Sequence, residues 1–472
     1  MITSRCRASI PVACLAIGVG LSGCVYRTIS VQPVSPVKVD FDKVAIENYP
    51  SGEAITNLWK SFDDPALEAL LKRALQENRS LQQVAARVDQ ARAVRGQAIA
   101  ALFPETQVSA YRNAEVPSKL NPLIPPSFSK INTFQAGFDS AWEIDLFGVA
   151  NYAAKATSAD LQASESNLAA ARQALIAETA QAYFSLRADQ AHLELALSRA
   201  KAAQTLATIA QQRRAVGRYS DIDAATLESQ SAAALSGLEP AKAAVDSDLN
   251  RLMVLTVLST DQIKALVADH HAMPRLNSLI PVGNPTDWLA RRPDVRAAEF
   301  NLRSAIARAN VARGEYFPTI TLTGFYGYNA QTAADIGRSA SRQWNFGPSI
   351  NWQFLNVGRT ISDIRSSNAA ARQALEQFDA TVLVALQETN NALEGFKAAS
   401  ESLQHWQVAA DTSRQQLDLN TRRAEIGAVD PLTAINAQLS YCDTADQLIN
   451  AQLRQVSLLA QLYKALAGDI TG

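Results

Sequence analysis

The chain has 472 residues, of which 47% are hydrophobic and 19% are charged, and its formal net charge is −1. A chain of this length can fold as two or three ordinary domains or as one elongated domain. Nucleic-acid binding requires a basic surface, and a chain with a near-neutral net charge has no excess of basic residues to form one. The net charge therefore disfavours nucleic acid as a partner.

The first 23 residues form a segment unlike the rest. Arg5 and Arg7 precede the apolar run ASIPVACLAIGVGLSG, which is shorter than a membrane-spanning helix and lies where a secretory signal lies. The run closes with LSGC, which resembles a bacterial lipoprotein signal with Cys24 as the acylated first residue of the mature chain, carrying palmitate or a similar fatty acid. The alternative is an ordinary signal followed by a chance cysteine. The sequence therefore predicts a signal over residues 1–23 and a lipid on Cys24.

The predicted mature chain has neither a disulfide nor a membrane helix. Cys6 and Cys14 leave with the signal and an acylated Cys24 has no free thiol, so Cys442 has no partner. We expect Cys442 to be a small packed thiol. No run of about 20 apolar residues follows the signal, and a closed barrel of strands is the other structure that satisfies every backbone polar group in a bilayer.

One order of elements occurs twice along the chain. LFPETQVSAY at 102–111 is echoed by YFPTITLTGF at 316–325, and GFDSAWEIDLFG at 137–148 is echoed by GPSINWQFLNVG at 347–358. Each half reads as helix, strand, loop, strand, very long helix, turn and helix, and each first helix stops at its Phe-Pro pair because proline cannot continue it. The predicted divisions are a first repeat over 24–258, a linker over 259–287 and a second repeat over 288–472.

Strict alternation predicts strands with one apolar and one polar face. In GPSINWQFLNVG, apolar side chains alternate with small and amide side chains, and residues 134–144 alternate in the same phase. The apolar face is predicted to contact lipid through Phe138, Trp142, Phe346, Ile350 and Trp352. The alternative is a strand of a soluble sandwich with one wet face.

The number of strands predicts an assembly. Four strands of about ten residues can cross a bilayer, but a membrane barrel needs about eight or more, and an open sheet would expose unpaired backbone groups to lipid. Two copies would give a barrel filled by side chains, whereas three would give about twelve strands around a lumen. The predicted lumen residues are those of the polar face, namely Gln135, Asp139, Glu143, Asn345, Ser349, Asn351 and Gln353.

Two very long helices follow the strands. Residues from about Val149 to Val216 contain no proline and no glycine, and a second such stretch runs from about Arg359 to Ile426 with Gly395 as its one interruption. At 1.5 Å per residue, each helix would span about 100 Å. Apolar residues recur at three- and four-residue steps, which predicts antiparallel coiled-coil packing. A coiled-coil scaffold is the simpler interpretation, but it explains neither the signal nor the strands.

These features together resemble the TolC-type outer-membrane efflux factors, in their NodT-like lipoprotein branch. The resemblance rests on the lipoprotein signal, the segment LWKSFDDPALEALLKRALQENRSLQQVAARVDQAR at 58–92, the paired Phe-Pro strands and the repeat, and it covers the mature chain. It implies a mostly helical fold with four strands per protomer and a homotrimer with a twelve-stranded barrel in the outer membrane. It further implies a helical tunnel in the periplasm that meets a periplasmic adaptor and an inner-membrane efflux pump.

The resemblance also assigns roles to the turns between the long helices. It implies adaptor-docking tips at Gly217, Arg218, Ser220, Asp223, Gly427 and Val429. The family often carries acids six and nine residues after the second glycine, where this chain has Thr433 and Asn436, which argues against a strongly acidic ring at the periplasmic gate. Asp430 with Arg422 and Arg423 could supply the polar groups of the gate instead. The alternative is that they only cap helices, since Asp430 precedes Pro431 as an N-cap residue would.

Catalysis has little support in the sequence. His192, His270, His271 and His405 make no zinc-ligand pattern, and no nucleophile, phosphate-binding or metalloprotease motif occurs. We therefore expect no enzyme, no cofactor and no metal site. The predicted function is a passive outer-membrane duct of a tripartite efflux system, and the alternatives are a polypeptide-secretion channel or a non-conducting periplasmic scaffold.

Overall fold

The computed structural model describes residues 59, 62–116, 118, 130–268, 273 and 285–466. Within these ranges the chain folds as two compact units, of which one comprises residues 93–160 and 301–375 and the other comprises the remaining described residues. Cys24, the signal and much of the predicted linker lie outside the described residues. None of the helices in the described part of the chain combines the length and the hydropathy that crossing a bilayer requires.

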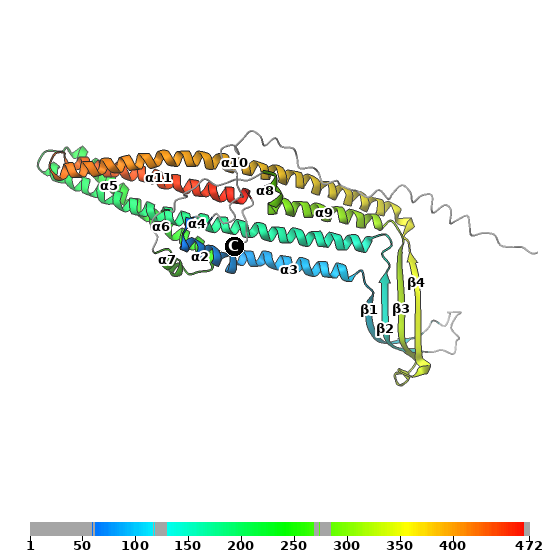
Figure 1. Cartoon of the computed structure of the whole chain (residues 1–472). Helices are drawn as coiled ribbons and strands as arrows, with labels where there is room; N and C mark the ends of the chain where they lie inside the picture. Colours follow the sequence, from blue (N-terminus) through cyan, green and yellow to red (C-terminus); the bar gives the residue numbers. More distant parts are fainter. Residues whose placement is uncertain are drawn as a thin grey trace, which may run out of the picture. The chain divides into compact units, whose positions relative to one another are not determined.

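The first unit contains a single antiparallel sheet of four strands in the order β1-β2-β3-β4, so strands consecutive in the chain lie side by side (Figure 1). The strands are β1 (Glu105–Glu115), β2 (Ile131–Glu143), β3 (Thr319–Ala330) and β4 (Arg342–Asn351). Their register sets Val108, Phe138, Tyr326 and Trp344 in one row across the sheet. The four predicted strands are confirmed. β1 and β4 are the edges, and within the described residues neither pairs with a further strand.

The same unit contains the helix ends that flank the strands. They belong to α3 (Arg79–Ala100), α4 (Val149–Ala215), α9 (Pro293–Gly314) and α10 (Val357–Glu425). A Cβ on Gly314 would lie 2.4 Å from Cγ2 of Val149, so glycine allows this close approach of α9 to α4. The rings of Phe147 and Phe317 stack with centroids 4.5 Å apart, which fixes the strand-to-helix junctions of the two halves against each other.

The two long helices have 67 residues in α4 and 69 in α10, which confirms the predicted extents to within two residues. The chain returns along α5 (Asp221–Ser236) and α6 (Leu238–Thr256) in the first half and along the unbroken α11 (Pro431–Ala465) in the second. In the second unit, α11 contacts both long helices. Its Gln438 donates to Oγ of Ser198 on α4 over 3.0 Å, and its Gln455 donates to Oγ of Ser400 on α10 over 3.0 Å.

The core of the second unit gathers apolar side chains of α2 (Pro65–Glu77), α7 (Thr260–Leu266) and α8 (Pro285–Arg291) against the long helices. Asp64 caps α2 through the backbone N–H of Ala66 and accepts a hydrogen bond from the hydroxyl of the buried Tyr183. Arg187 donates to that hydroxyl over 3.0 Å and to the carbonyl of Val267 over 2.8 Å. Burial raises the pKa of Tyr183 above its ordinary value of 10.0, so this buried network is held by a neutral phenol.

Each half of the chain ties its beginning to its end through one buried side chain. Asn78 caps α3 and donates to the carbonyl of Leu255, near the end of α6. Arg292 precedes α9 and donates to the carbonyl of Ala465, the last residue of α11. Asn78 and Arg292 lie at equivalent places in the two repeats, so the duplication extends from the strands to these helix-end contacts. Arg292 is 1% exposed and also pairs with Glu388 over 2.6 Å.

One sequence expectation changes on the structure, namely where the last strand ends. Strand β4 ends at Asn351, so Trp352 lies just after it and Phe354 begins a short 3-10 turn, Phe354–Asn356. Placing these two residues within the strand was wrong, because the chain turns there into α10 although the apolar alternation continues.

Cys442 is 1% exposed and burial raises the pKa of its thiol, which confirms the expectation of a packed cysteine.

Candidate functional site

The sheet has two chemically distinct faces. The register places the even-numbered residues of all four strands on one side, where large apolar side chains are open to the surroundings. Phe346 is 69% exposed, Ile350 71% and Phe138 56%, and Trp142 is 36% exposed. Soluble proteins rarely leave contiguous apolar surfaces of this kind uncovered. The predicted lipid-contact residues Phe138, Trp142, Phe346 and Ile350 therefore share one exposed face.

Two tryptophans stand at equivalent positions where the apolar face meets the helix ends. Nε1 of Trp142 donates to the carbonyl of Leu102 over 3.0 Å, and Nε1 of Trp352 donates to the carbonyl of Tyr316 over 3.2 Å. Both acceptors immediately precede a Phe-Pro pair. Each indole thus has its polar atom bonded while its apolar ring stays exposed, which is typical of aromatic residues at a membrane–water boundary.

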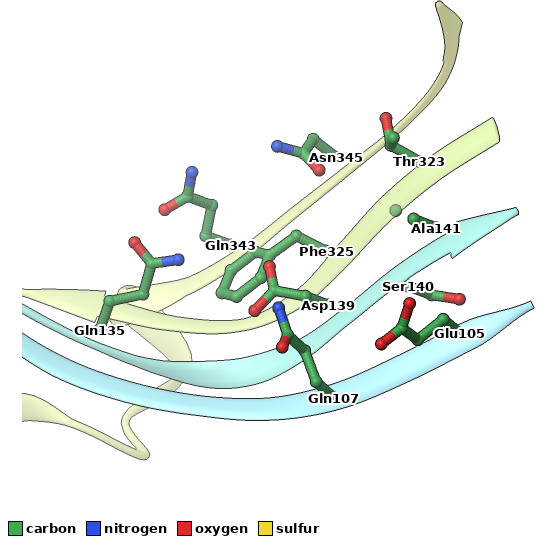
Figure 2. A pocket seen from close by; sticks show the side chains of 11 residues that line it. Glu105, Gln107, Gln135, Asp139, Ser140, Ala141, Thr323, Phe325, Gln343 and Asn345 are labelled. Carbon is green, nitrogen blue, oxygen red and sulfur yellow. The ribbon is translucent and has the colours of Figure 1, made fainter. Parts of the chain in front are cut away.

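The odd-numbered face is polar and holds a groove of about 510 Å³ (Figure 2). Gln107, Gln135, Gln343 and Asn345 contribute amide side chains to it from three strands. Asp139 accepts a hydrogen bond from Oγ of Ser109 over 2.5 Å. These residues include the predicted lumen residues Gln135, Asp139 and Asn345, so the alternation did assign the two faces as the structure has them.

Phe325 is an aromatic residue on the polar face that sequence reasoning did not single out. It is 7% exposed, although the residues around it in Figure 2 are polar. Gly137 and Gly327 are paired in the register, and a Cβ on either would lie within 2.8 Å of the Phe325 ring. The ring therefore occupies the space above two glycines. Paired glycines beneath a same-face aromatic were the signal that could have found it.

The two faces of the sheet carry charged side chains of opposite sign. On the polar face, the charged residues of β1–β4 are Glu105, Glu115, Asp139 and Glu143, and no lysine or arginine occurs there within these strands. The apolar face carries two charged residues within the strands, and both are arginines. A lumen formed by the polar face would thus be acidic.

The second unit carries the two helix turns, which share one backbone conformation. Gly217 and Gly427 have φ of +71° and +73°, in the left-handed region that glycine adopts without strain. After α4, the backbone N–H groups of Gly217 and Arg218 donate to the carbonyls of Arg214 and Arg213, respectively. After α10, the N–H groups of Gly427 and Ala428 donate to the carbonyls of Ala424 and Arg423 in the same way. This is the glycine-terminated helix end known as the Schellman motif. Both predicted tip glycines therefore reverse the chain.

The helices that leave the turns are capped by different residues at equivalent positions. Ser220 and Asp223 form a reciprocal capping box at the start of α5. Asp430 caps α11 by accepting from the N–H of Leu432 over 2.9 Å, with Pro431 as the first helical residue. The capping role considered for Asp430 is confirmed. Arg218, Gly427, Thr433 and Asn436 are exposed, and Val429 is half-buried.

Asp430 also forms an ion pair that sequence reasoning missed. Its Oδ1 lies 2.8 Å from Nη2 of Arg213, near the end of α4, so the two turns of one protomer are joined. The hydrogen bond from Arg213 lowers the pKa of Asp430 below its ordinary value of 3.8. Arg422 and Arg423 are exposed, and within the described residues neither pairs with Asp430. Arg213 occupies in the first turn the place that Arg423 occupies in the second, which is the signal that could have found it.

Exposed apolar residues flank both turning glycines. Val216 is 69% exposed and Ile426 80%, each directly before its glycine, and Ile222 is 77% exposed at the start of α5. Such residues are candidates for contact with another protein. Among the described residues, no group of three or more histidine, cysteine or acidic side chains is placed to hold a metal ion.

Comparison with known proteins agrees with this geometry. The model of the family described as outer membrane efflux protein matches two segments of the chain, residues 70–256 and 284–468. The chain belongs to the outer membrane efflux protein family. It is 31% identical to outer membrane protein OprJ of Pseudomonas aeruginosa over 97% of this chain and 95% of that protein. It is 27% identical to the toluene efflux pump outer membrane protein TtgF of Pseudomonas putida over 96% of each chain.

Solved structures of outer-membrane channels share the fold. The outer-membrane channel OprN superposes with a TM-score of 0.82 at 28% identity, covering 91% of this chain and 98% of that one. The CmeC outer membrane channel of Campylobacter jejuni superposes with a TM-score of 0.81 at 22% identity, covering 89% and 90%. The predicted fold, mostly helical with long helices and four antiparallel strands, is confirmed by these likenesses.

Proposed function

We propose that this chain is the outer-membrane exit channel of a tripartite efflux system and conducts passively what an inner-membrane pump and a periplasmic adaptor deliver. The observation that carries the proposal is a two-faced, four-stranded sheet whose edge strands pair with no further strand of the described part of the chain. The family and the efflux-pump names of its relatives OprJ and TtgF support the same function. We assign to the chain no catalytic activity, cofactor or resident metal.

The unpaired edges support assembly as a homotrimer. In lipid every backbone N–H and C=O must be paired, so β1 of one copy has to pair with β4 of another until the sheet closes. Three copies close twelve strands around a lumen, whereas two copies close about eight strands around an interior filled by side chains. The apolar face then contacts lipid and the polar face lines the pore.

The same arrangement supports a preference for cations. Each copy contributes four acids and no base from its strands to the polar face, namely Glu105, Glu115, Asp139 and Glu143. A low-dielectric wall lined by one sign of charge concentrates ions of the opposite sign. We expect the open pore to pass potassium faster than chloride.

We also propose that the two turns form the periplasmic tips and the gate. Gly217 and Gly427 shape the tips, and the exposed Val216, Ile222 and Ile426 offer apolar contacts to an adaptor. The ion pair between Arg213 and Asp430 joins the two turns within a protomer, so opening of the gate either breaks this ion pair or moves both turns together. Arg422, Arg423, Thr433 and Asn436 remain proposed gate residues, open for contacts between copies.

We further propose that Cys24 is the acylated first residue of the mature chain, which places the protein in the lipoprotein branch of the family and anchors it in the outer membrane. The basis is LSGC after a short apolar run. The repeats over 24–258 and 288–472 with their linker remain the proposed division of the chain. Mass spectrometry of the purified protein tests the anchor, and an unmodified Cys24 or a retained signal would contradict it.

Conductance decides between the duct and its alternatives. The full-length protein, purified from outer membranes, should have the mass of a trimer and open pores in planar bilayers, with a reversal potential that reports cation preference. Asp139→Asn should weaken that preference because it removes one acid per copy from the pore wall. A protein that forms no pore would be a scaffold. A protein that forms pores but fails to restore drug resistance to a strain lacking its own duct would favour polypeptide secretion.

A further inference from the structure

Two arginines are the charged residues of the apolar face. Arg112 on β1 and Arg342 on β4 have even numbers, and the register places them on the side of Phe138 and Phe346. Both side chains are exposed. Within the described residues neither guanidinium forms an ion pair. An otherwise uncharged, lipid-facing surface thus carries two unpaired positive charges.

The arginines lie at one end of that face. Arg342 is the first residue of β4, which has 10 residues, and Trp352 follows its last residue. At about 3.3 Å per residue the strand is about 33 Å long, and a tilt of about 40° reduces the height to about 25 Å. That height equals the apolar band of an outer-membrane barrel, about 25 Å. If Trp352 marks one boundary of the bilayer, Arg342 stands at the other, where lipid headgroups begin.

Energetics require the same location. An arginine on the lipid face costs about 2–4 kcal/mol at the midplane and about 0–1 kcal/mol near a boundary. The aromatic rings beside the two arginines fit a boundary position. Cζ of Arg112 lies 5.5 Å from the centroid of the Phe134 ring, and Arg342 is opposite Tyr328 in the register. An arginine whose stem rests on aromatic surface presents its charged end to the headgroups.

The strand order brings the two arginines together only in an assembly. In one protomer they stand on opposite edges of the sheet, three strands apart. When β4 of one copy pairs with β1 of the next, Arg342 and Arg112 come from adjacent strands across the seam. Within one protomer Arg112 is level with Phe134 and Arg342 with Ala136, so both arginines lie toward the same end of the apolar face. The register across the seam adds the stagger that closes a barrel. The assembled barrel would carry three such pairs.

We infer that each seam between protomers holds an anionic lipid of the outer leaflet, whose headgroup phosphate is bound by Arg342 of one copy and Arg112 of the next. Guanidinium groups bind phosphate through two parallel charge-assisted hydrogen bonds, and the apolar rows below offer a surface for the acyl chains. The leaflet is the outer one because these arginines stand at the end of the strands away from the helices. The inference rests on the proposed trimeric channel and adds a lipid ligand to it.

Native mass spectrometry of the full-length trimer in phosphatidylcholine nanodiscs tests the site, with the diphosphorylated glycolipid lipid A as the probe. We expect about three tightly held lipid A molecules per trimer. Arg112→Gln with Arg342→Gln should weaken the affinity at least about tenfold, because hydrogen bonds to charged groups each contribute more than one factor of ten. Arg112→Lys with Arg342→Lys should fall between, since the charge stays and the planar fork is lost.

Arg338→Gln is the matched control. Arg338 is a 68% exposed arginine between β3 and β4 that pairs with Asp335, and its loss should leave lipid A affinity unchanged. Glutamine variants that bind lipid A within twofold of the wild type would overturn the inference, as would inorganic phosphate that competes as well as the lipid does.

Conductance of the same preparations keeps the two proposals apart. A wild-type channel that conducts without retaining lipid A refutes the lipid site alone. A trimer that retains lipid A through the arginines but does not conduct supports the site and refutes the channel. A monomeric mass refutes the seam.

Discussion

Replacing Gly327 by alanine should destabilise the sheet, whereas the same change at Gly347 should not. A Cβ on Gly327 would lie 2.4 Å from the carbonyl oxygen of Ala136, 2.6 Å from Cα of Gly137 and 2.8 Å from Cζ of Phe325. The first two atoms belong to the backbone of the paired strand β2, so β2 and β3 must separate locally to make room. On the same face of the neighbouring strand, a Cβ on Gly347 would meet nothing within 4 Å.

The size of the effect follows from these contacts. Overpacking typically costs about 1–3 kcal/mol, and each ladder hydrogen bond weakened by the separation adds about 0.5–1.5 kcal/mol. We therefore expect Gly327→Ala to lower the free energy of unfolding by about 2–4 kcal/mol per protomer. Gly347→Ala should change it by less than about 0.5 kcal/mol, as open surface positions do.

Denaturant unfolding of both variants in detergent micelles, followed by tryptophan fluorescence, measures the difference. Adding Phe325→Ala to Gly327→Ala separates the ring from the backbone as the source of strain. The double variant should recover little, because the two shortest contacts are to backbone atoms. Equal stability of Gly327→Ala and Gly347→Ala would refute the reasoning, and full recovery in the double variant would move the strain to the ring.

Three further predictions use other parts of the chain. Ile350→Lys should impair membrane assembly by about 2–4 kcal/mol, whereas Asn351→Lys on the polar face should assemble and shift ion selectivity; similar assembly yields would contradict the assigned faces. Asp430→Asn keeps a good N-cap residue but loses the ion pair with Arg213, so resting conductance should rise, and an unchanged conductance would place the closing contacts elsewhere. Because the pKa of Asp430 is lowered below 3.8, the wild-type pair persists above that pH and is lost as pH falls through the lowered value. Burial raises the pKa of Asp248 above its ordinary value of 3.8; the stability that its protonated form contributes is therefore lost as pH rises from 3.8 through the raised pKa, so Asp248→Asn should raise the Tm at pH 7 and flatten the fall of the Tm as pH rises above 3.8.

Local physical rules made much of this fold predictable from the sequence. The Phe-Pro pairs end α3 and α9 because proline cannot continue a helix, and the long stretches without proline or glycine became α4 and α10. Alternation with a period of two assigned Ile350 to the apolar face and Asn345 to the polar one. These features depend on neighbours within a few residues, which any sequence displays directly. The place where β4 ends was less predictable, since the alternation runs past Asn351.

Contacts between distant parts of the chain came only from the tertiary structure. The sequence shows that Asp430 can cap a helix, but its ion pair with Arg213 joins residues 217 positions apart. Phe325 is an apolar residue among polar neighbours, and only the register shows that Gly137 and Gly327 lie beneath its ring. Arg112 and Arg342 share a face because three strand pairings align them. Local propensity fixes how each segment folds, whereas the choice of partner depends on which segments bury surface and satisfy backbone groups together, and that is decided by the whole chain at once.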